Sequence, residues 1–183
     1  MTLQERYKKQ AVPAMMQKFG YKNALAVPRL VKIVVNTGFG KAIAGKTGED
    51  LKKILEDITR DLSLLTGQKP AMTRSKKSIS GFKLRQGIAI GAKVTLRGKR
   101  MYDFADRLVN IVLPRSRDFR GIPAASFDKN GNLSIGIKEH VFFIEVPLDK
   151  VRHTFGLEIT LTANSKNREQ GRELFKLLGF PIQ

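Results

Sequence analysis

The apolar and polar positions along the chain predict both helices and strands. Leucine and isoleucine residues between 51 and 65 recur every three or four positions, which puts them on one face of a helix ending near Gly67. These residues are Leu51, Ile54, Leu55, Ile58, Leu62 and Leu65. In residues 88–97 the apolar positions alternate with Lys93, Thr95 and Arg97, as in a strand with one buried and one polar face.

Further segments complete the predicted fold. Residues 30–36 are rich in β-branched side chains and predict a strand, and residues 155–163 alternate as residues 88–97 do. Amphipathic helices are predicted near the N-terminus, at 102–112 and at 168–178, with Pro13 kinking or splitting the first. Strands with one polar face are typical of antiparallel sheets. The sequence therefore predicts an α+β fold, a single domain over residues 1–183 with a mainly antiparallel sheet, helices covering one face and the other face exposed.

The charge distribution points to a polyanionic partner. The 183 residues carry 34 Lys and Arg against 16 Asp and Glu, a formal net charge of +18. Residues 62–102 hold ten of these cations and no acid, although surface charges of both signs are normally interspersed. This pattern favours nucleic acid over an anionic membrane as the partner. The chain has no apolar run of membrane-spanning length and no signal-peptide pattern, so we expect a soluble cytoplasmic protein that does not bind a membrane.

The centre of this acid-free window reads TRSKKSISGFKLRQG, from Thr73 to Gly87. Its glycines and serines predict a loop over residues 75–87, which suits RNA better than a DNA major groove, where a helix usually enters. Ile79 and Phe82 either pack on exposed bases or, in the case of Phe82, fold back onto the core; the sequence leaves both possibilities open. Lys93, Thr95 and Arg97 add donors suited to phosphate and 2′-hydroxyl groups.

A rival hypothesis comes from residues 40–47, GKAIAGKT, which match the phosphate-binding pattern GxxxxGK[ST] between a predicted strand and a predicted helix. In that hypothesis Lys46 reaches the terminal phosphates and Thr47 holds magnesium. Three features count against this hypothesis. The predicted strand ends near Asn36, so residues 36–39 would lengthen the turn that normally begins at the first glycine. No later apolar strand ends in a convincing magnesium-binding Asp, and the nearest candidate is 141–144 before Glu145. The later strands also alternate, unlike the buried parallel sheet of nucleotide-binding folds.

Other catalytic chemistry finds little support. The chain has no cysteine, and His140 and His153 have no carboxylate or serine at a meaningful spacing, so both are interpreted as surface or packing residues. No metal-ligand cluster is recognisable. The sequence therefore predicts a protein that is not an enzyme and has no cofactor or metal.

Several longer motifs resemble one known family, the universal large-subunit ribosomal protein five in its bacterial form, nearly from end to end. The motifs are VPRLVKIVVNTGFG (27–40), LTGQKPAMTRSKKSISGFKLRQG (65–87), GAKVTLRGKRMYDF (91–104), LPRSRDFRG (113–121) and GLEITLTA (156–163). The resemblance implies a structural protein of the large ribosomal subunit that binds 5S ribosomal RNA, anchors it in the central protuberance and lies near 23S ribosomal RNA.

The resemblance also implies particular site residues. The positions matching the family's 5S contacts are Asn36 in VVNTG, Gln68 in TGQKP, and Thr95 and Arg97 in KVTLRG, to which the polar strand face adds Lys93. From the residues alone, Asn36 and Gln68 would have turn or cap roles. The family's basic loop contacts the tRNA in the ribosomal P site, and the residues implied here are Arg74, Lys76, Lys77, Phe82, Lys83 and Arg85.

The family further bridges to small-subunit ribosomal protein thirteen through its later half. Departures from the family pattern fall there, at FDKNGN (127–132) and within 146–156. The predicted function is thus a structural, RNA-binding constituent of the large subunit. Two alternatives stay open at this point: a nucleotide-binding protein using residues 40–47, and a general RNA chaperone without preference among RNAs.

Overall fold

The computed structural model describes residues 1–46, 48–117 and 119–183. The α-helices are α1 (Leu3–Arg6), α2 (Val12–Phe19), α3 (Gly40–Ile43), α4 (Gly48–Thr66), α5 (Gly98–Arg107), α6 (Leu113–Arg115) and α7 (Arg168–Leu177). The strands are β1 (Leu30–Gly38), β2 (Ala71–Arg74), β3 (Ala89–Leu96), β4 (Leu133–Ile137) and β5 (Leu157–Ala163). Two π-helical turns, η1 (Tyr7–Ala11) and η4 (Leu108–Val112), lie between α-helical segments.

The strands form a five-stranded, mainly antiparallel sheet in the order β2-β3-β1-β5-β4. β2 and β3 are antiparallel neighbours, with Ala71 opposite Lys93 and Thr73 opposite Gly91. A Cβ atom at Gly91 would lie 2.7 Å from Thr73 Oγ1 and 2.8 Å from the Thr37 carbonyl oxygen, so the close strand contact there requires glycine. The predicted α+β fold class is confirmed, and the strands predicted at 30–36, 88–97 and 155–163 are β1, β3 and β5.

The described residues group into two compact units. Unit 1 comprises Met1–Ile33, Leu96–Ile135 and Thr160–Gln183, and unit 2 comprises Val34–Thr95 and Gly136–Ile159. Parts of β1, β3, β4 and β5 belong to each unit. The expectation of a single domain over the whole chain stays a prediction.

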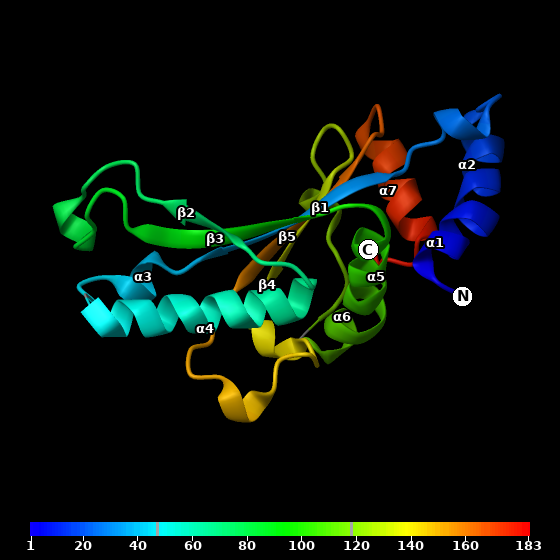
Figure 1. Ribbon diagram of the computed structural model, residues 1–183. Helices are drawn as coiled ribbons and strands as arrows, with labels where there is room; N and C mark the ends of the chain where they lie inside the picture. Colours follow the sequence, from blue (N-terminus) through cyan, green and yellow to red (C-terminus); the bar gives the residue numbers. More distant parts are fainter. Residues whose placement is uncertain (47, 118) are drawn as a thin grey trace. The chain divides into compact units, whose positions relative to one another are not determined.

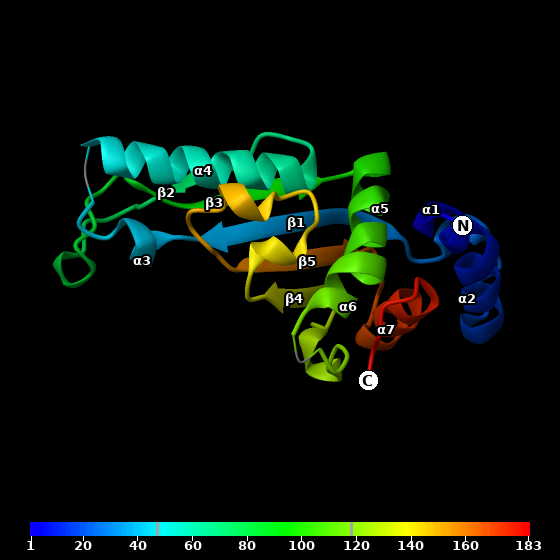
Figure 2. The ribbon, with the colours of Figure 1, turned by 90° about the horizontal axis from the view of Figure 1, so that it is seen from below.

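In unit 2, α4 runs along one side of the strands (Figures 1 and 2). Its buried apolar residues, Ile54, Ile58, Leu62 and Leu65, pack on that side. The helix ends at Gly67, which has a φ of 69° and whose N–H donates to the Ser63 carbonyl, as predicted for a helix C-cap. Leu51 and Leu55 are only half-buried, because the helix face they occupy turns toward a surface hollow beside β2.

Two irregular segments of unit 2 connect neighbouring elements. Residues 75–88, hereafter the basic loop, join β2 to β3 and contain a single 3-10 turn, η3 (Ser80–Phe82). Residues 138–156, hereafter the β4–β5 connection, contain the 3-10 turns η6 (His140–Phe142) and η7 (Leu148–Lys150). The candidate strand at 141–144 is therefore absent, because those residues fall in and after a 3-10 turn.

Unit 1 packs helices around an aromatic core. Phe175 of α7 lies 5.8 Å from the ring centre of Phe127 and 5.3 Å from that of Phe180. The helical path runs without a break from α1 through η1 into α2, so Pro13 does not split it. Pro13 lies in the first turn of α2, directly after the π-helical turn in which Val12 N–H donates to the Tyr7 carbonyl, so the proline coincides with a local change in the helical hydrogen bonding. α5 begins at Gly98, earlier than predicted, and its helical path ends at Arg115, one residue after Pro114.

Candidate nucleic-acid interface

One side of the unit 2 strands carries the predicted polar residues. On β3, Lys93 and Thr95 are exposed, whereas Ala92 and Val94, on either side of Lys93, are buried. On β1, half-buried Asn36 stands between two buried residues. Because side chains alternate across a strand, Lys93, Thr95 and Asn36 lie on the side opposite α4. Among the described residues of unit 2, no helix covers this side (Figure 1), which we call the open face.

The structure brings Gln68 and Thr95 together. Gln68 follows the end of α4, and its Nε2 donates a hydrogen bond to the Thr95 carbonyl oxygen, at 3.0 Å. Its own carbonyl accepts from Thr66 Oγ1 at 3.1 Å. The backbone of β3 is thereby tied to the segment after α4, while the Thr95 hydroxyl stays exposed.

Arg97 belongs to unit 1 and is described there. It lies one residue beyond β3 at the N-cap position of α5, with an extended backbone of φ −141° and ψ 165°. Its side chain is exposed and makes no capping hydrogen bond. The guanidinium group is therefore accessible to solvent, although Arg97 lies beyond the strand face on which the sequence placed it, and its role in binding RNA stays a prediction.

The basic loop is held by backbone hydrogen bonds. Ser75 N donates to Ile88 O at 2.8 Å, and Ile79 and Leu84 exchange hydrogen bonds of 3.0 and 3.2 Å across the tip. Arg74 Nη1 donates to the Gly87 carbonyl at 3.0 Å, which fastens the base of the loop. Ser75 Oγ also donates to the Lys77 carbonyl, and Ser78 Oγ accepts from Gln86 N. Apart from Arg74 and these two serines, the bonds use main-chain groups, and the side chains of the lysines, of Arg85 and of Phe82 take no part in them.

The side chains predicted to meet RNA are exposed. Phe82 exposes 65% of its surface and Ile79 46%, so Phe82 does not fold back into the core. Lys76, Lys77, Lys83 and Arg85 are also exposed, and in the described part of the chain none pairs with a carboxylate. Lys83 has a left-handed backbone with φ 50°, which turns the chain at the tip. A hollow of about 650 Å³ between the tip and α3 is lined by Phe82, Lys83 and Lys41 among others.

Residues 40–47 do not form a phosphate-binding loop over the part described. Residues 40–43 are helix α3, and the N–H groups of Ala42 and Ile43 both donate to the Phe39 carbonyl. Lys46 N donates to Ile43 O, so three amides that would cradle a phosphate are already bonded within the segment. Thr47, the predicted magnesium ligand, lies outside the described residues.

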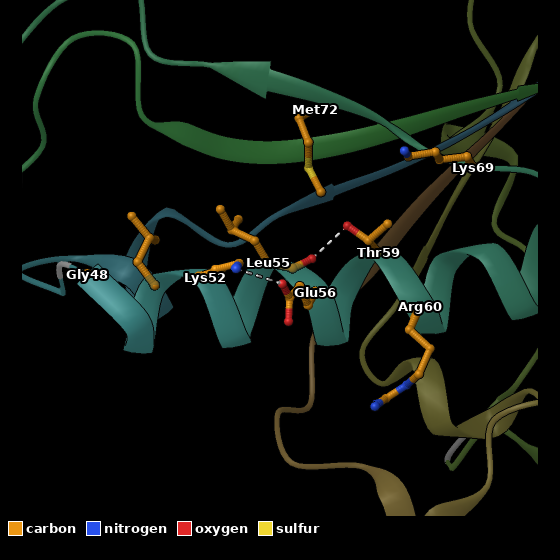
Figure 3. A pocket seen from close by; sticks show the side chains of 9 residues that line it. Gly48, Lys52, Leu55, Glu56, Thr59, Arg60, Lys69 and Met72 are labelled. Carbon is orange, nitrogen blue, oxygen red and sulfur yellow. Dashed lines mark hydrogen bonds and ion pairs between the residues drawn. The ribbon is translucent and has the colours of Figure 1, made fainter.

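On the covered side of unit 2, α4 and β2 border a hollow of about 600 Å³ (Figure 3). Met72 projects from β2 toward Leu55 and Thr59 of α4. Lys52 at its rim is 3.9 Å from Glu56, so the rim carries both charges. The hollow therefore lacks the one-sided positive charge of the open face and the basic loop.

Sequence reasoning missed a buried polar cluster beneath α4. His140 is fully buried, and its ring stacks on Phe155 with centres 3.9 Å apart. Phe155 N donates to His140 Nδ1 at 3.3 Å, which leaves the proton on Nε2, 3.4 Å from Asp61 Oδ2. At that length Nε2 and the carboxylate form an electrostatic contact without a well-made hydrogen bond.

Burial lowers the pKa of His140 below its usual value of 6.5, although Asp61 opposes this shift. His140 is thus a neutral packing residue, which is one of the two roles that the sequence predicted. Its carboxylate partner, Asp61, lies 79 positions earlier in the chain. Only a long-range pairing signal between positions 61 and 140 would have exposed this contact, because neither residue has a recognisable local motif.

The described residues contain no group of three or more His, Asp and Glu arranged to hold a metal ion. No described helix combines the length and apolar character needed to cross a bilayer. The arrangement is that of a binding surface: an open polar face, an exposed guanidinium group and an unpaired cationic loop.

Comparison with known proteins gives consistent matches. The family model for the C-terminus of ribosomal protein L5 matches residues 89–182, and the model named ribosomal protein L5 matches residues 23–85. The large ribosomal subunit protein uL5 of Alkaliphilus oremlandii is 51% identical over 180 residues, which cover 98% of this chain and 97% of the relative. The uL5 of Syntrophomonas wolfei is 51% identical over 99% of this chain and 98% of the relative. The uL5 of Halothermothrix orenii is 49% identical over 98% and 97%, respectively.

Proposed function

Because the chain belongs to the family of the large ribosomal subunit protein uL5, we propose that its open face and Arg97 bind 5S ribosomal RNA and that its basic loop contacts the tRNA in the ribosomal P site. Membership of this family makes the protein a non-enzymatic structural constituent of the large ribosomal subunit, with ribosomal RNA as its partner. The proposal assigns particular RNAs to particular surfaces.

The observation that carries the 5S proposal is the open face itself. Lys93, the Thr95 hydroxyl and the Asn36 amide provide a cation and both donors and acceptors on one side of two adjacent strands. Rigid strands position such groups better than a flexible segment would, and the Gln68 hydrogen bond adds rigidity at Thr95. Folded RNA is recognised through phosphates, 2′-hydroxyls and exposed base edges, which match this set of groups.

The tRNA proposal rests on a division of roles in the basic loop: the groups that hold its shape differ from the side chains that are exposed to a partner. Main-chain hydrogen bonds hold its shape, while its cations and Phe82 are exposed. A loop of this kind can follow a phosphate backbone and place an aromatic ring on a base or ribose.

A third contact is proposed for the β4–β5 connection. Its Ile144 and Leu148 expose 57% and 67% of their surfaces, so both apolar side chains are accessible to a protein partner. This supports the bridge to small-subunit ribosomal protein thirteen that the family resemblance implies.

The 5S proposal is tested by electrophoretic mobility shift with isolated 5S RNA. Thr95→Val and Arg97→Ala should each weaken the complex about tenfold, since each removes one hydrogen bond, charge-assisted for Arg97. Lys53→Gln on α4 serves as a charge control, because Lys53 is exposed and 3.8 Å from Glu49 on the side away from the open face. Equal affinity for unrelated RNAs of the same length would contradict specific 5S binding and support the RNA-chaperone alternative.

The loop proposal is tested with a combined variant, Lys76→Gln, Lys77→Gln, Phe82→Ala and Arg85→Gln. The variant should keep its affinity for 5S RNA and lower tRNA occupancy of the P site in ribosomes that carry it. Normal occupancy would refute the role of the loop without affecting the 5S proposal.

A further inference from the structure

Two adjacent surface hollows in unit 1 share a wall of two cations and one phenol. Tyr7, Lys8 and Arg29 line both hollows. The larger, about 360 Å³, also borders Val31 and Tyr102, and the smaller, about 300 Å³, borders Leu25. These volumes lie at the lower end of the range for small-ligand sites, about 300–1,000 Å³. Each hollow is therefore suited to a single small group such as one nucleotide.

The elements that carry these side chains are fixed in place. Tyr7 and Lys8 lie at the start of η1 directly after α1, and Tyr102 lies on α5; α1 and α5 are side by side in both views (Figures 1 and 2). The backbone of Arg29 is clamped by Asn164, whose Oδ1 accepts from Arg29 N at 2.6 Å and whose N–H donates to Arg29 O at 3.2 Å. The backbone that carries the wall is thus preorganised, which reduces the entropy cost of binding.

The electrostatics of the wall favour an anion with an aromatic part. Neither Lys8 nor Arg29 forms an ion pair with any described residue, and the residues that line the hollows include no acid. Burial raises the pKa of Tyr7 and of Tyr102, and Arg29 opposes the shift in both. Both phenols are therefore neutral at physiological pH and present faces for stacking and hydroxyls for hydrogen bonds.

The apolar rim adds a second feature of nucleotide sites. Leu25 exposes 89% of its surface and Val31 38%, next to the cationic wall. A purely acidic segment such as polyglutamate could pair with Lys8 and Arg29, but it has no aromatic or apolar group to pack on the half-buried tyrosines and the exposed aliphatic side chains. Proteins that bind single-stranded RNA combine this set, with cations on the backbone and aromatic or apolar faces on the bases.

We propose that Tyr7, Lys8, Arg29 and Tyr102 form a second RNA-binding site that takes an unpaired nucleotide. The base lies against the phenol rings, and the phosphate pairs with Arg29 and Lys8. The four residues belong to unit 1 and differ from those assigned to 5S RNA and to tRNA, so variants can test this site separately.

Tyrosine fluorescence tests this site directly. The chain has no tryptophan and only three tyrosines, two of which line the hollows. Tyr21→Phe removes the third, so that all remaining emission in this background comes from the proposed site. Titration with an unstructured oligoribonucleotide of about six nucleotides should give saturable quenching, because bases stacked on the phenols quench them.

Variants assign the quenching to particular groups. In the Tyr21→Phe background, Arg29→Gln should weaken the affinity roughly tenfold and reduce the slope of log affinity against log salt by about 0.7, the contribution of one phosphate contact in a single strand. Tyr102→Leu should weaken it roughly 5- to 100-fold through lost stacking, whereas Tyr102→Phe keeps the ring and should largely retain binding. Lys166→Gln, an exposed unit 1 cation outside the hollows, is the matched control and should change nothing.

The outcomes separate this site from the 5S proposal. Thr95→Val should leave the quenching unchanged, and Arg29→Gln should leave the 5S mobility shift unchanged. No saturable quenching, or an equal loss with Arg29→Gln and Lys166→Gln, would overturn the second site. Quenching by polyglutamate with the same affinity would also overturn it and would point to an acidic protein segment as the ligand.

Discussion

The two irregular segments of unit 2 solve the same structural problem in different ways. The basic loop keeps its shape through main-chain hydrogen bonds, and Phe82 at its tip is 65% exposed. The β4–β5 connection is anchored by side chains: Phe143, Val146 and Phe155 are buried with His140. The basic loop therefore leaves its cations and Phe82 free for a partner, whereas the β4–β5 connection commits several large side chains to the core and exposes only some, such as Ile144 and Leu148.

Replacing Phe143 or Phe82 by alanine should change the stability of the protein by very different amounts. Phe143→Ala should lower the free energy of unfolding by about 3–5 kcal/mol, because it leaves a cavity in the core of the β4–β5 connection. Phe82→Ala should change it by less than about 0.5 kcal/mol, because an exposed ring leaves no cavity. Chemical denaturation of both variants gives the comparison. Similar losses for the two would show that the basic loop also depends on side-chain packing.

An intermediate effect concerns pH and the anchor of the β4–β5 connection. The pKa of His140 is lowered in the folded protein, so below pH 6.5 the unfolded chain binds more protons than the folded one. The free energy of unfolding should therefore fall as the pH decreases from about 6.5 toward the folded pKa. Urea denaturation at several pH values measures the slope, and NMR titration of the imidazole measures the pKa itself.

Two variants show which histidine causes this dependence of stability on pH. His140→Phe keeps a ring that can stack on Phe155 and removes the titrating group, so the slope between about pH 6.5 and 5 should flatten. His153→Gln removes the other histidine and should leave the slope in place. Stability that rises on acidification would mean that attraction to Asp61 outweighs the burial of His140.

The smallest expected effect tests the backbone of the basic loop. Lys83→Gly removes the side chain from a left-handed position, where any residue with a Cβ carries strain, so stability should rise by up to about 1 kcal/mol. Gly81→Ala is the counterpart, because Gly81 has an ordinary φ and nothing lies within 4 Å of an added Cβ. A loss of stability with Lys83→Gly would show that the Lys83 side chain supports the loop tip, where its Cδ would lie 3.7 Å from a Cβ at Gly45.

Local patterns predicted the regular elements because their causes are local. The alternation in residues 88–97 yields β3 with Lys93 and Thr95 exposed, and the periodicity of residues 51–65 yields α4. The glycines and serines of the basic loop correctly predicted an irregular segment. In each case the periodicity or the turn residues lie within a single short stretch of sequence.

The missed features depend on residues far apart in the sequence. Asp61 looks like one more polar position on α4 until the β4–β5 connection brings His140 against it. Strand β2 carries too short a pattern to be singled out and is defined by its pairing with β3. The wall formed by Tyr7, Arg29 and Tyr102 likewise comes from three separate segments of unit 1, so no single motif announces it.

The hydrogen bonds that join the two ends of the β4–β5 connection have a practical consequence. His140 N donates to Phe155 O at 3.0 Å, and Phe155 N donates back to the His140 ring, so both ends of the segment are joined before it reaches its exposed tip. Closing a longer segment between fixed ends costs little additional entropy. A short epitope tag inserted beside Leu148 should therefore leave the sheet intact while it obstructs the bridge contact proposed for this segment.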